Sequence, residues 1–390
     1  MTLLSITLEC FALLSVLIWL VLFFARGNFW RVWEHSDPAQ LPLPTNWPRV
    51  IVVVPARNEA ASIAEVVRAL AQQDYAGEFS AVVVDDHSDD GTTYLARQAA
   101  ISASSSGNVT ILSAPELASG WTGKLWALNA GVSQSSNSRP DYFWFTDADV
   151  FHAPDTLRRL IVRAERDRLD LVSLMVLLKA ETFVERLLIP PFLYFFLMLY
   201  PPKWTANRAA STAGAAGGCI LLRRSALEHI GGLSAIRGAI IDDCALARAV
   251  KRSGGDIWMG LTRASRSLRS YETFSQIRDM VARTAFTQLR YSAAMLLGTL
   301  VGMTLTFLLP VALTFSANPR VWPVALAAWC LMAASFLPTV TFYGLRPIWA
   351  PLLPLAALFY VYATFLSAIR YWLGHGGQWK GRAQANRTAG

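Results

Sequence analysis

The sequence Asp147-Ala-Asp149 follows directly on the apolar run Tyr142–Thr146. Burying two carboxylates beside an apolar strand is costly unless a cation or hydrogen bonds compensate for the lost water. Mg²⁺ and Mn²⁺ prefer such hard oxygen ligands, and they also bind diphosphate oxygens. We therefore predict a divalent metal ion at this pair, where it would stabilise a diphosphate leaving group.

A second acidic pair, Asp85 and Asp86, follows the apolar run Val82–Val84. Carboxylates at the end of a strand can accept hydrogen bonds from a nucleobase or from ribose hydroxyls. Asp and Ser side chains in a turn also serve as helix caps, so this pair alone leaves both interpretations open.

A third acidic pair, Asp242 and Asp243, stands just before a predicted amphipathic helix that begins at Cys244. One of these carboxylates could take the proton from an acceptor hydroxyl as a general base. The alternative is that both simply compensate the positive end of the helix dipole.

The apolar run Val50–Val54 ends in a polar turn that contains Pro55, Arg57 and Glu59. In open α/β sheets, ligands bind beyond the carboxyl ends of the strands, so this turn is well placed for binding. Taken alone, the turn is a weak signal, and it gains meaning from the acidic pairs that follow it.

These motifs need a sheet to bring them together, and residues 50–291 have the pattern of one. Short apolar runs alternate there with helical patterns. The predicted strands are Val50–Val54, Ala81–Val84, Val109–Leu112, Tyr142–Thr146 and Leu169–Leu174. Near-continuous apolar strands separated by helices favour a parallel sheet covered on both faces. Ser62 and Glu65 have the spacing of a capping box at the start of the first helix.

The composition indicates membrane segments. Of 390 residues, 54% are hydrophobic and 16% are charged, against about 25% charged in soluble domains. The net charge of +8 comes from dispersed basic residues, so we expect no nucleic-acid partner. The four cysteines lie far apart, which favours neither a zinc site nor a disulfide framework.

Hydropathy divides the chain into five parts. We predict a transmembrane anchor at 1–25, a linker at 26–48, a catalytic domain at 49–291, membrane helices at 292–375 and a basic tail at 376–390. A signal peptide is the alternative for the first part, but no basic region precedes its apolar stretch. Arg26 and Arg31 follow the anchor, which by the positive-inside rule places the catalytic domain in the cytoplasm.

The C-terminal part holds three apolar stretches of spanning length, Ala293–Ser316, Val321–Phe342 and Pro351–Tyr371. Three full crossings would put the basic tail outside, against the charge rule, so we expect that one of them does not cross completely. The apolar block Phe183–Tyr200 lies inside the catalytic domain. We expect it to break at Pro190–Pro191 and to lie at the membrane interface, with a buried helix as the alternative.

Together, in this order and spacing, the motifs resemble those of family 2 inverting glycosyltransferases of the GT-A fold, from about Arg49 to Tyr291. The resemblance implies an α/β nucleotide-diphospho-sugar transferase domain with one N-terminal and about three C-terminal transmembrane helices. It implies Asp243 as the catalytic base, with Asp242 in the position where the family has Glu. Asp149, with help from Asp147, would hold Mg²⁺ or Mn²⁺. The implied donor-binding residues are Pro55, Arg57, Glu59, Asp85, Asp86, Lys124, Asn129, Asp147, Arg283 and Arg290.

Three further stretches carry the resemblance. Residues Gly120–Gly131 match a family segment and provide Lys124 and Asn129, while Gly214–Gly218 precedes a strand on the acceptor side. The terminal stretch Gln378–Arg382 is similar to one in lipid-linked members; it could gate the site or bind anionic headgroups, or could simply be an interfacial Trp with basic neighbours.

One family motif is altered in this sequence. Processive polysaccharide synthases carry Gln-x-x-Arg-Trp near the first following membrane helix. Here Thr287 stands in place of Gln, Arg290 is kept and Tyr291 replaces Trp. Arg290, or Arg283, could still bind diphosphate, but the change disfavours a processive polymerase.

Within the family, the sequence looks most like the hopene-associated glycosyltransferases of bacteria. The expected function is transfer of a sugar from a nucleotide-sugar donor to a membrane lipid at the cytoplasmic face of the bacterial inner membrane. The resemblance implies a UDP-sugar as the donor and a hopanoid as a candidate acceptor. A processive polysaccharide synthase and a non-catalytic nucleotide-sugar sensor are the alternatives. A transporter is disfavoured, because the polar motifs lie outside the membrane spans.

Overall fold

The computed structural model describes residues 3–32, 44–103, 108–135, 138–374, 378–379 and 382–383. The chain forms two compact units. The sheet unit comprises Trp33–Lys179, Trp204–Ser270 and Gly377–Gly390, and the helical unit comprises Met1–Val32, Ala180–Lys203 and Tyr271–Gly376. The predicted domain 49–291 therefore includes parts of both units. Much of the predicted linker and of the basic tail, including part of Gln378–Arg382, lies outside the described residues.

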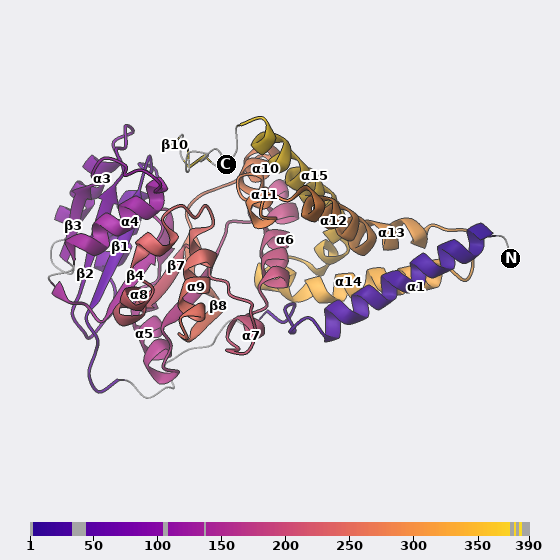
Figure 1. The fold of residues 1–390 in the computed structure, drawn as a ribbon, viewed down its shortest axis with the longest axis horizontal. Coiled ribbons are helices and arrows are strands. Elements are labelled where there is room, and N and C mark those ends of the chain that lie inside the picture. Colours follow the sequence, from indigo (N-terminus) through magenta and orange to yellow (C-terminus); the bar gives the residue numbers. More distant parts are fainter. Residues whose placement is uncertain are drawn as a thin grey trace. The chain divides into compact units, whose positions relative to one another are not determined.

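An eight-stranded mixed sheet, in the order β3-β2-β1-β4-β7-β6-β8-β5, forms the centre of the sheet unit (Figure 1). Its strands are β1 (Val50–Ala56), β2 (Phe79–Asp85), β3 (Asn108–Ser113), β4 (Tyr142–Thr146), β5 (Val150–His152), β6 (Leu171–Leu177), β7 (Cys219–Arg223) and β8 (Ile257–Ser267). The predicted strand at 169–174 thus begins two residues later and ends three residues later than expected.

The prediction of a parallel sheet is right for β3, β2, β1 and β4 and for the pair of β6 with β8, and it is wrong for β7 and β5. Strand β1 pairs in parallel with β2 and β4, and β2 with β3. Strand β7 runs antiparallel to both β4 and β6, and β5 runs antiparallel to β8. The chain leaves the sheet at the carboxyl end of β6 and re-enters it along β7 at the same edge, which reverses the strand direction there.

Helices cover both faces of this sheet, as expected. On one face, Val52 and Trp144 pack with α2 (Ile63–Ala71), α3 (Thr92–Ser102) and α5 (Thr156–Arg166). On the other face, Val53 and Phe145 pack with α4 (Gly123–Gln134), α8 (Arg224–His229), η3 (Leu233–Ile236) and α9 (Asp242–Arg252). Alternate side chains of one strand thus enter opposite layers, because successive residues of a strand point to opposite faces.

Two helix starts differ from the expectation. Ser62 makes no capping hydrogen bond to α2; its hydroxyl donates instead to the carbonyl oxygen of Ala148 at 2.9 Å. Helix α9 begins at Asp242, so the third acidic pair forms its first two residues rather than preceding it. The first difference ties α2 to the turn that carries the Asp147–Asp149 pair, and the second places Asp243 at a helix N-terminus.

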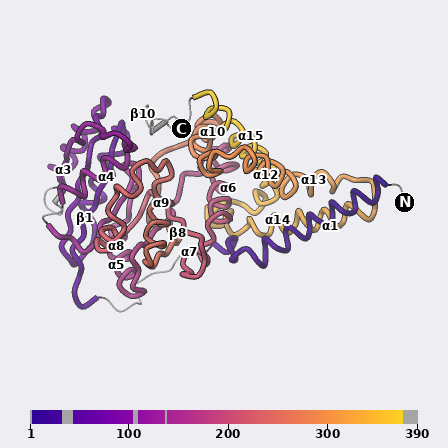
Figure 2. The backbone as a smooth tube through the Cα atoms, viewed as in Figure 1, coloured from indigo at the N-terminus to yellow at the C-terminus, as the bar shows by residue number. Residues whose placement is uncertain are grey.

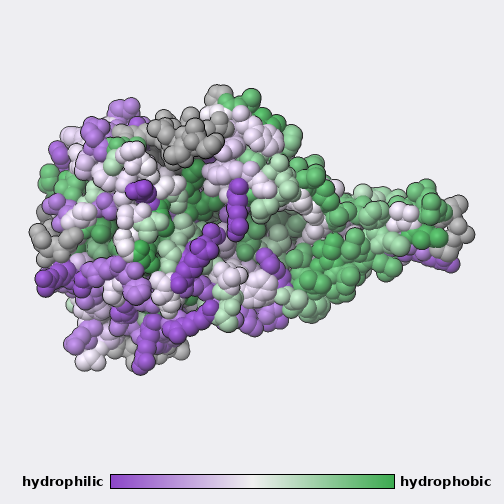
Figure 3. Space-filling model, in the orientation of Figure 1, coloured by the Kyte–Doolittle hydropathy of each residue, from purple (hydrophilic) through white to green (hydrophobic). Residues whose placement is uncertain are grey.

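The helical unit contains α1 (Leu3–Phe24), α6 (Phe183–Leu199), α10 (Phe274–Ala282), α11 (Ala285–Gln288), α12 (Ala293–Met303), a π-helical turn η4 (Thr304–Leu308), α13 (Leu309–Thr314), α14 (Trp322–Phe342), η5 (Pro347–Leu352) and α15 (Leu353–Trp372). Short helix α7 (Pro202–Thr205) follows α6. Helices α1 and α14 lie side by side (Figure 2). The surface of α1 and its neighbours is strongly hydrophobic (Figure 3).

Five segments among the described residues are long and apolar enough to cross a membrane: Leu3–Phe24, Phe183–Thr205, Ala293–Thr314, Trp322–Phe342 and Pro347–Trp372. One segment lies near the N-terminus and three are C-terminal, which agrees with the predicted numbers of membrane helices. The remaining one contains α6.

The sequence predicted a break at Pro190–Pro191. This prediction is wrong, because helix α6 continues through both prolines. Its ends return to one sheet, because β6 precedes it, β7 follows it, and Leu171 of β6 pairs with Leu222 of β7. A complete crossing by α6 would put paired strands on opposite sides of the membrane, so it is incompatible with this sheet. Its location at the membrane interface remains a prediction.

Candidate active site

The polar turns after β1, β2 and β4 lie at one edge of the sheet. These three strands are parallel neighbours, and Ala56 at the end of β1 is in register with Asp85 at the end of β2. The carboxyl ends of parallel strands meet at the same edge, where α/β proteins bind ligands. The residues that directly follow these three strands in the sequence therefore gather at this edge.

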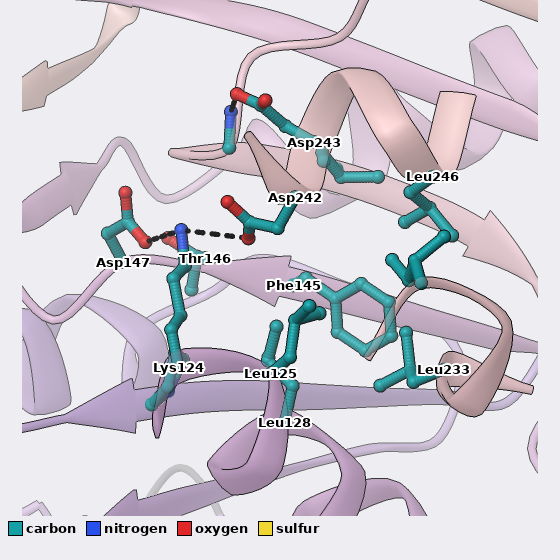
Figure 4. A pocket seen from close by; sticks show the side chains of 14 residues that line it. Lys124, Leu125, Leu128, Phe145, Thr146, Asp147, Leu233, Asp242, Asp243 and Leu246 are labelled. Atoms are coloured by element: carbon teal, nitrogen blue, oxygen red, sulfur yellow. Dashed lines mark hydrogen bonds and ion pairs between the residues drawn. The ribbon is translucent and has the colours of Figure 1, made fainter. Parts of the chain in front are cut away.

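A pocket at this edge brings three of the predicted carboxylates and one predicted cation together (Figure 4). The Lys124 ammonium lies 2.8 Å from Asp147 Oδ1 and 3.4 Å from Asp242 Oδ2. Asp243 and Pro55 line the same pocket. Its other wall is apolar and comes from β4, β7, α4, η3 and α9: Leu125, Leu128, Phe145, Ile220, Leu233, Ile236 and Leu246.

The Asp243 carboxylate is fixed by backbone donors. Gly217 N–H donates to Oδ2 at 2.8 Å and Cys244 N–H donates to Oδ1 at 2.7 Å. In Figure 4 the side chain turns away from Lys124 toward the first of these donors. Burial and then the charge of Asp242 raise the pKa of Asp243 to about 6, against the opposing effects of Lys124 and the two backbone donors. Asp243 is thus an oriented carboxylate with a greater proton affinity than an exposed one.

Gly217 is needed at this place because the space beside it is filled. A Cβ atom there would lie 3.2 Å from Lys124 Nζ and 3.3 Å from Asp243 Oδ2. Both contacts are tighter than ordinary van der Waals separation, so any side chain would displace the cation or the carboxylate. The sequence predicted that the glycine-rich stretch lets a ligand approach the backbone closely. In the structure, Gly217 also lets Lys124 and Asp243 approach it closely.

Lys124 remains charged although it is largely buried. Burial alone would lower its pKa, but the charges of Asp147, Asp242 and Asp243 outweigh that effect and raise the pKa above its ordinary value. Its position follows from the start of α4, where the Thr122 hydroxyl accepts from Leu125 N–H as the N-cap. Lys124 is the second residue of that helix, and its side chain extends into the acidic pocket.

Asp149 belongs to a neighbouring ionic cluster. Arg269, which sequence reasoning did not select, donates from Nε to Asp149 Oδ2 at 2.9 Å and from Nη2 to the two Glu59 oxygens at 2.9 and 3.1 Å. Burial and then the Asp147 charge raise the pKa of Asp149 to about 6, although Arg269 opposes this. Charge coupling to Asp147 and Lys124 therefore joins this cluster to the pocket.

The residues around Asp147 and Asp149 fit a divalent cation. Five carboxylates, those of Glu59, Asp147, Asp149, Asp242 and Asp243, face two basic side chains, Lys124 and Arg269, which leaves an excess of negative charge. Within the described ranges no three His, Cys, Asp or Glu side chains are grouped closely enough to hold a metal by themselves. Mg²⁺ commonly takes one or two carboxylates and completes its shell with phosphate oxygens and water, so the carboxylate pair suffices.

The turns after β1 and β2 are joined by hydrogen bonds. Arg57 Nη1 donates to the carbonyl oxygens of Asp86 and His87, and it lies 3.8 Å from the buried Asp86 carboxylate. Asn58 N–H donates to Ser88 Oγ at 2.9 Å. The two predicted nucleotide-binding turns thus form one rigid surface.

A buried histidine behind the site was also missed. His152 lies 2.6 Å from Thr146 Oγ1 and 2.8 Å from Ser265 Oγ, while Thr146 Oγ1 donates to Gly218 O at 3.0 Å. Since the single Thr146 hydroxyl proton goes to Gly218, His152 Nε2 donates to Thr146 and Nδ1 accepts from Ser265. Burial lowers the pKa of His152 to about 3, so it is neutral near pH 7. This series of hydrogen bonds links β8 and β5 to the backbone of Gly218, next to Gly217.

Of the predicted site residues, five line the pocket: Pro55, Lys124, Asp147, Asp242 and Asp243. Those at the ends of β1, β2 and β4 or in the turns after them that do not line it are Arg57, Glu59, Asp85, Asp86 and Asp149. Asn129 lies on α4, half-buried, but it is not among the residues that line the pocket. Arg283 and Arg290 belong to the helical unit, and their contact with a donor remains a prediction. Arg290 and Tyr291 both have left-handed backbones, with φ of 51° and 56°, which is unusual for residues other than glycine.

The sheet unit has a mixed α/β fold of the GT-A type with a curled sheet. A mannosyltransferase from Pyrobaculum calidifontis, solved in complex with GDP-Man and Mn²⁺, is similar with a TM-score of 0.55 and 20% identity, covering 94% of this chain and 99% of the other. At this identity the likeness shows the fold alone.

Residues 51–231 match the family model described as glycosyl transferase family 2. An N-acetylglucosaminyltransferase from Rhizobium leguminosarum bv. viciae is 30% identical over 183 residues, which are 46% of this chain and 40% of the relative. Another from Mesorhizobium japonicum is 26% identical over 198 residues, which are 50% of this chain and 43% of the relative. The match spans less than half the length of either relative.

Proposed function

We propose that this protein transfers a sugar from a nucleotide-diphosphate donor to a hydroxyl group of a membrane lipid, with inversion at the anomeric carbon. The observation that carries the proposal is the pocket in which Lys124, Asp147, Asp242 and Asp243 meet at the carboxyl edge of the sheet. The match to the family 2 model, which contains the first two of these residues, supports a transfer reaction.

Asp243 acts as the general base in this proposal. The acceptor hydroxyl gives its proton to the Asp243 carboxylate while its oxygen forms a bond to the anomeric carbon. The bond from that carbon to the diphosphate oxygen breaks on the opposite face, and the electron pair leaves with the diphosphate. Two backbone donors hold Asp243 in one orientation, which favours a single geometry of attack.

The turns after β1 and β2 hold the nucleotide, through Arg57, Asp85 and Asp86, and the diphosphate lies toward Lys124. Lys124 is a fixed positive charge with which a phosphate oxygen can pair as charge develops. A divalent ion, held by Asp147 and Asp149 when bound, supplies further positive charge to the leaving diphosphate. The Mn²⁺ and GDP-Man bound by the similar mannosyltransferase support a donor and an ion of this kind.

A membrane lipid is the proposed acceptor because the part of the chain that the structure describes includes five segments long and apolar enough to cross a membrane. The resemblance to hopene-associated enzymes suggests a hopanoid, and the family suggests a uridine donor. We place the sheet unit at the cytoplasmic face of the bacterial inner membrane, from the basic residues Arg26 and Arg31 that follow α1.

The test is an assay of nucleoside diphosphate release by the detergent-solubilised full chain. UDP-N-acetylglucosamine, UDP-glucose and GDP-mannose are supplied in turn, with total bacterial lipid extract or without it, and with Mn²⁺ or with a chelator. We expect lipid-dependent release from one donor and a lipid product heavier by one sugar residue in mass spectrometry.

Two results would contradict the proposal. Binding of a donor without turnover would identify the protein as a nucleotide-sugar sensor. A ladder of products differing by one sugar would identify a processive synthase, which is the alternative that the altered Gln-x-x-Arg-Trp motif disfavours.

A further inference from the structure

Each carboxylate of the proposed metal-binding pair is already engaged by a basic side chain from elsewhere in the chain. Asp147 Oδ1 lies 2.8 Å from Lys124 Nζ, at the start of α4. Asp149 Oδ2 lies 2.9 Å from Arg269 Nε, two residues beyond the end of β8. The two carboxylates are thus neutralised by separate segments.

These ion pairs compete with a metal ion. Mg²⁺ requires carboxylate oxygens at about 2.0–2.1 Å, and one oxygen of each carboxylate, Asp147 Oδ1 and Asp149 Oδ2, already faces a basic nitrogen. A cation that stays within hydrogen-bond distance of the same carboxylate also repels a divalent ion strongly in a partly buried site. Lys124 and Arg269 therefore oppose binding of the ion as long as they stay paired with these carboxylates.

The donor offers both side chains a new partner. Arg and Lys bind phosphate oxygens well, and the side chains are long enough to rotate from a carboxylate to a nearby anion. Arg269 also contacts Glu59, so it keeps an anionic partner while it releases Asp149. A diphosphate between the two basic residues would accept their charges and free the carboxylates.

We propose that Arg269 and Lys124 make metal binding conditional on the donor, so that the divalent ion and the nucleoside diphosphate bind cooperatively and each binds weakly alone. This inference rests on the proposed function and adds to it a binding order enforced by the chain's own cations. By linkage, the factor by which the diphosphate tightens metal binding equals the factor by which the metal tightens diphosphate binding.

Arg269 is the better residue to test. Lys124 contacts Asp242 as well as Asp147 and lines the pocket beside Asp243, so its removal would also disturb the proposed base. Arg266 lies in β8, three residues before Arg269, and forms an ion pair with the exposed Glu65 at 3.6 Å. It therefore provides a matched control.

The experiment measures Mn²⁺ affinity by electron paramagnetic resonance of the free ion, with the solubilised full chain. Wild type, Arg269→Gln, Arg269→Lys and Arg266→Gln are each titrated alone and with UDP or GDP. For wild type we expect weak binding alone and at least about tenfold tighter binding with the diphosphate that fits, within the usual range of coupling. For Arg269→Gln we expect tighter Mn²⁺ binding without nucleotide, by about tenfold, and a smaller coupling factor.

The expected gain of affinity cannot come from misfolding, which would only weaken binding. Arg269→Lys, which keeps the charge, and Arg266→Gln should both behave as wild type. Tight Mn²⁺ binding by wild type alone, or an Arg269→Gln variant that binds Mn²⁺ no better than wild type while the diphosphate still tightens binding, would overturn the inference and leave the proposed function intact. No Mn²⁺ binding with either nucleotide would overturn both the inference and the metal in the proposed function.

Discussion

The two units of this protein bury polar groups in different ways. In the sheet unit, the buried or partly buried groups at the sheet edge are mostly charged and gathered together, as with Lys124, Asp147 and Asp243. In the helical unit, typical examples are neutral and separate. Tyr194 O–H lies 2.6 Å from Ser335 Oγ, and Trp19 Nε1 donates to Thr306 O at 2.8 Å.

The difference separates structural polar groups from functional ones. A neutral donor with one acceptor is satisfied at little cost, and the Thr306 carbonyl oxygen, within the π-helical turn η4, is such an acceptor for Trp19. A cluster of like charges raises the energy of the folded state and is kept where it serves chemistry.

Glu185 sharpens the contrast, because it is a buried carboxylate in the helical unit. It accepts hydrogen bonds from the backbone N–H groups of Glu181, Thr182 and Tyr271, and it completes a capping box with Thr182. Asp243 has similar backbone donors but also lies beside Asp242 and Lys124. Backbone donors fix both carboxylates in place, whereas burial and then the charge of Asp242 raise the pKa of Asp243.

Among the neutral groups of the sheet unit, His152 is expected to have the largest effect on stability. Its replacement by alanine removes a buried ring and leaves the Ser265 hydroxyl without its ring partner, for a loss of about 3 kcal/mol. Thermal unfolding of the solubilised protein should show a midpoint lower by ~6–12 °C. A midpoint within 2 °C of the wild-type value, on the order of half a kcal/mol, would show that the hydrogen bonds of His152 contribute little to stability.

Gly217 tests how tightly the charged cluster is packed. Its replacement by alanine should lower the transfer rate by ~10–100-fold, because a Cβ would displace Lys124 and Asp243 by a few tenths of an ångström. Gly298 in α12 has no neighbouring atom within 4 Å of such a Cβ, so Gly298→Ala should leave the rate unchanged. Equal rates for wild type and both variants would show that the cluster tolerates displacement.

The pH dependence tests the raised pKa of Asp243. A base must be ionised to accept a proton, so kcat/KM should rise with pH up to about 6 and stay level above it. Asp242 raises the pKa of Asp243, so Asp242→Asn should move the rising limb to lower pH, even if the rate falls. A limb that stays in place in this variant would exclude Asp243 as the titrating group.

The smallest effect is expected in the helical unit. Tyr194→Phe removes one neutral hydrogen bond, while Ser335 keeps its bond to the Met332 carbonyl oxygen. We expect a loss of about 1 kcal/mol in stability and no change in the pH dependence of transfer. A change in the pH dependence would contradict the separation of structural and functional polar groups.

The parallel strands and the acidic motifs could be predicted from the sequence because they are local patterns. Strands β1, β2 and β4 are continuous apolar runs, and each ends at its polar motif. Strand β8 was missed because Arg263 and Arg266 interrupt its apolar pattern, and β5 because it has three residues.

Arg269 and His152 could not be selected by local patterns. Arg269 reaches Glu59 across 210 positions of the sequence, and His152 reaches Ser265 across 113. The pairing of β5 with β8 places His152 opposite Ser265, and Arg269 follows β8 by two residues. The Thr-Asp-Ala-Asp motif indicated where charge would gather, but it did not show which cations would balance that charge.

The central claim is that Asp243 removes the proton from the acceptor. It is tested most directly by the rate of nucleoside diphosphate release with saturating donor and lipid, for wild type, Asp243→Asn and Asp167→Asn. Asp167 is the control, because it directly follows α5 and pairs with Arg163 and Arg166. We predict that Asp243→Asn lowers the rate by ~10²–10⁴-fold with unchanged affinity for the nucleoside diphosphate, while Asp167→Asn retains the wild-type rate. An Asp243→Asn variant that releases the diphosphate within a few-fold of the wild-type rate would contradict the account.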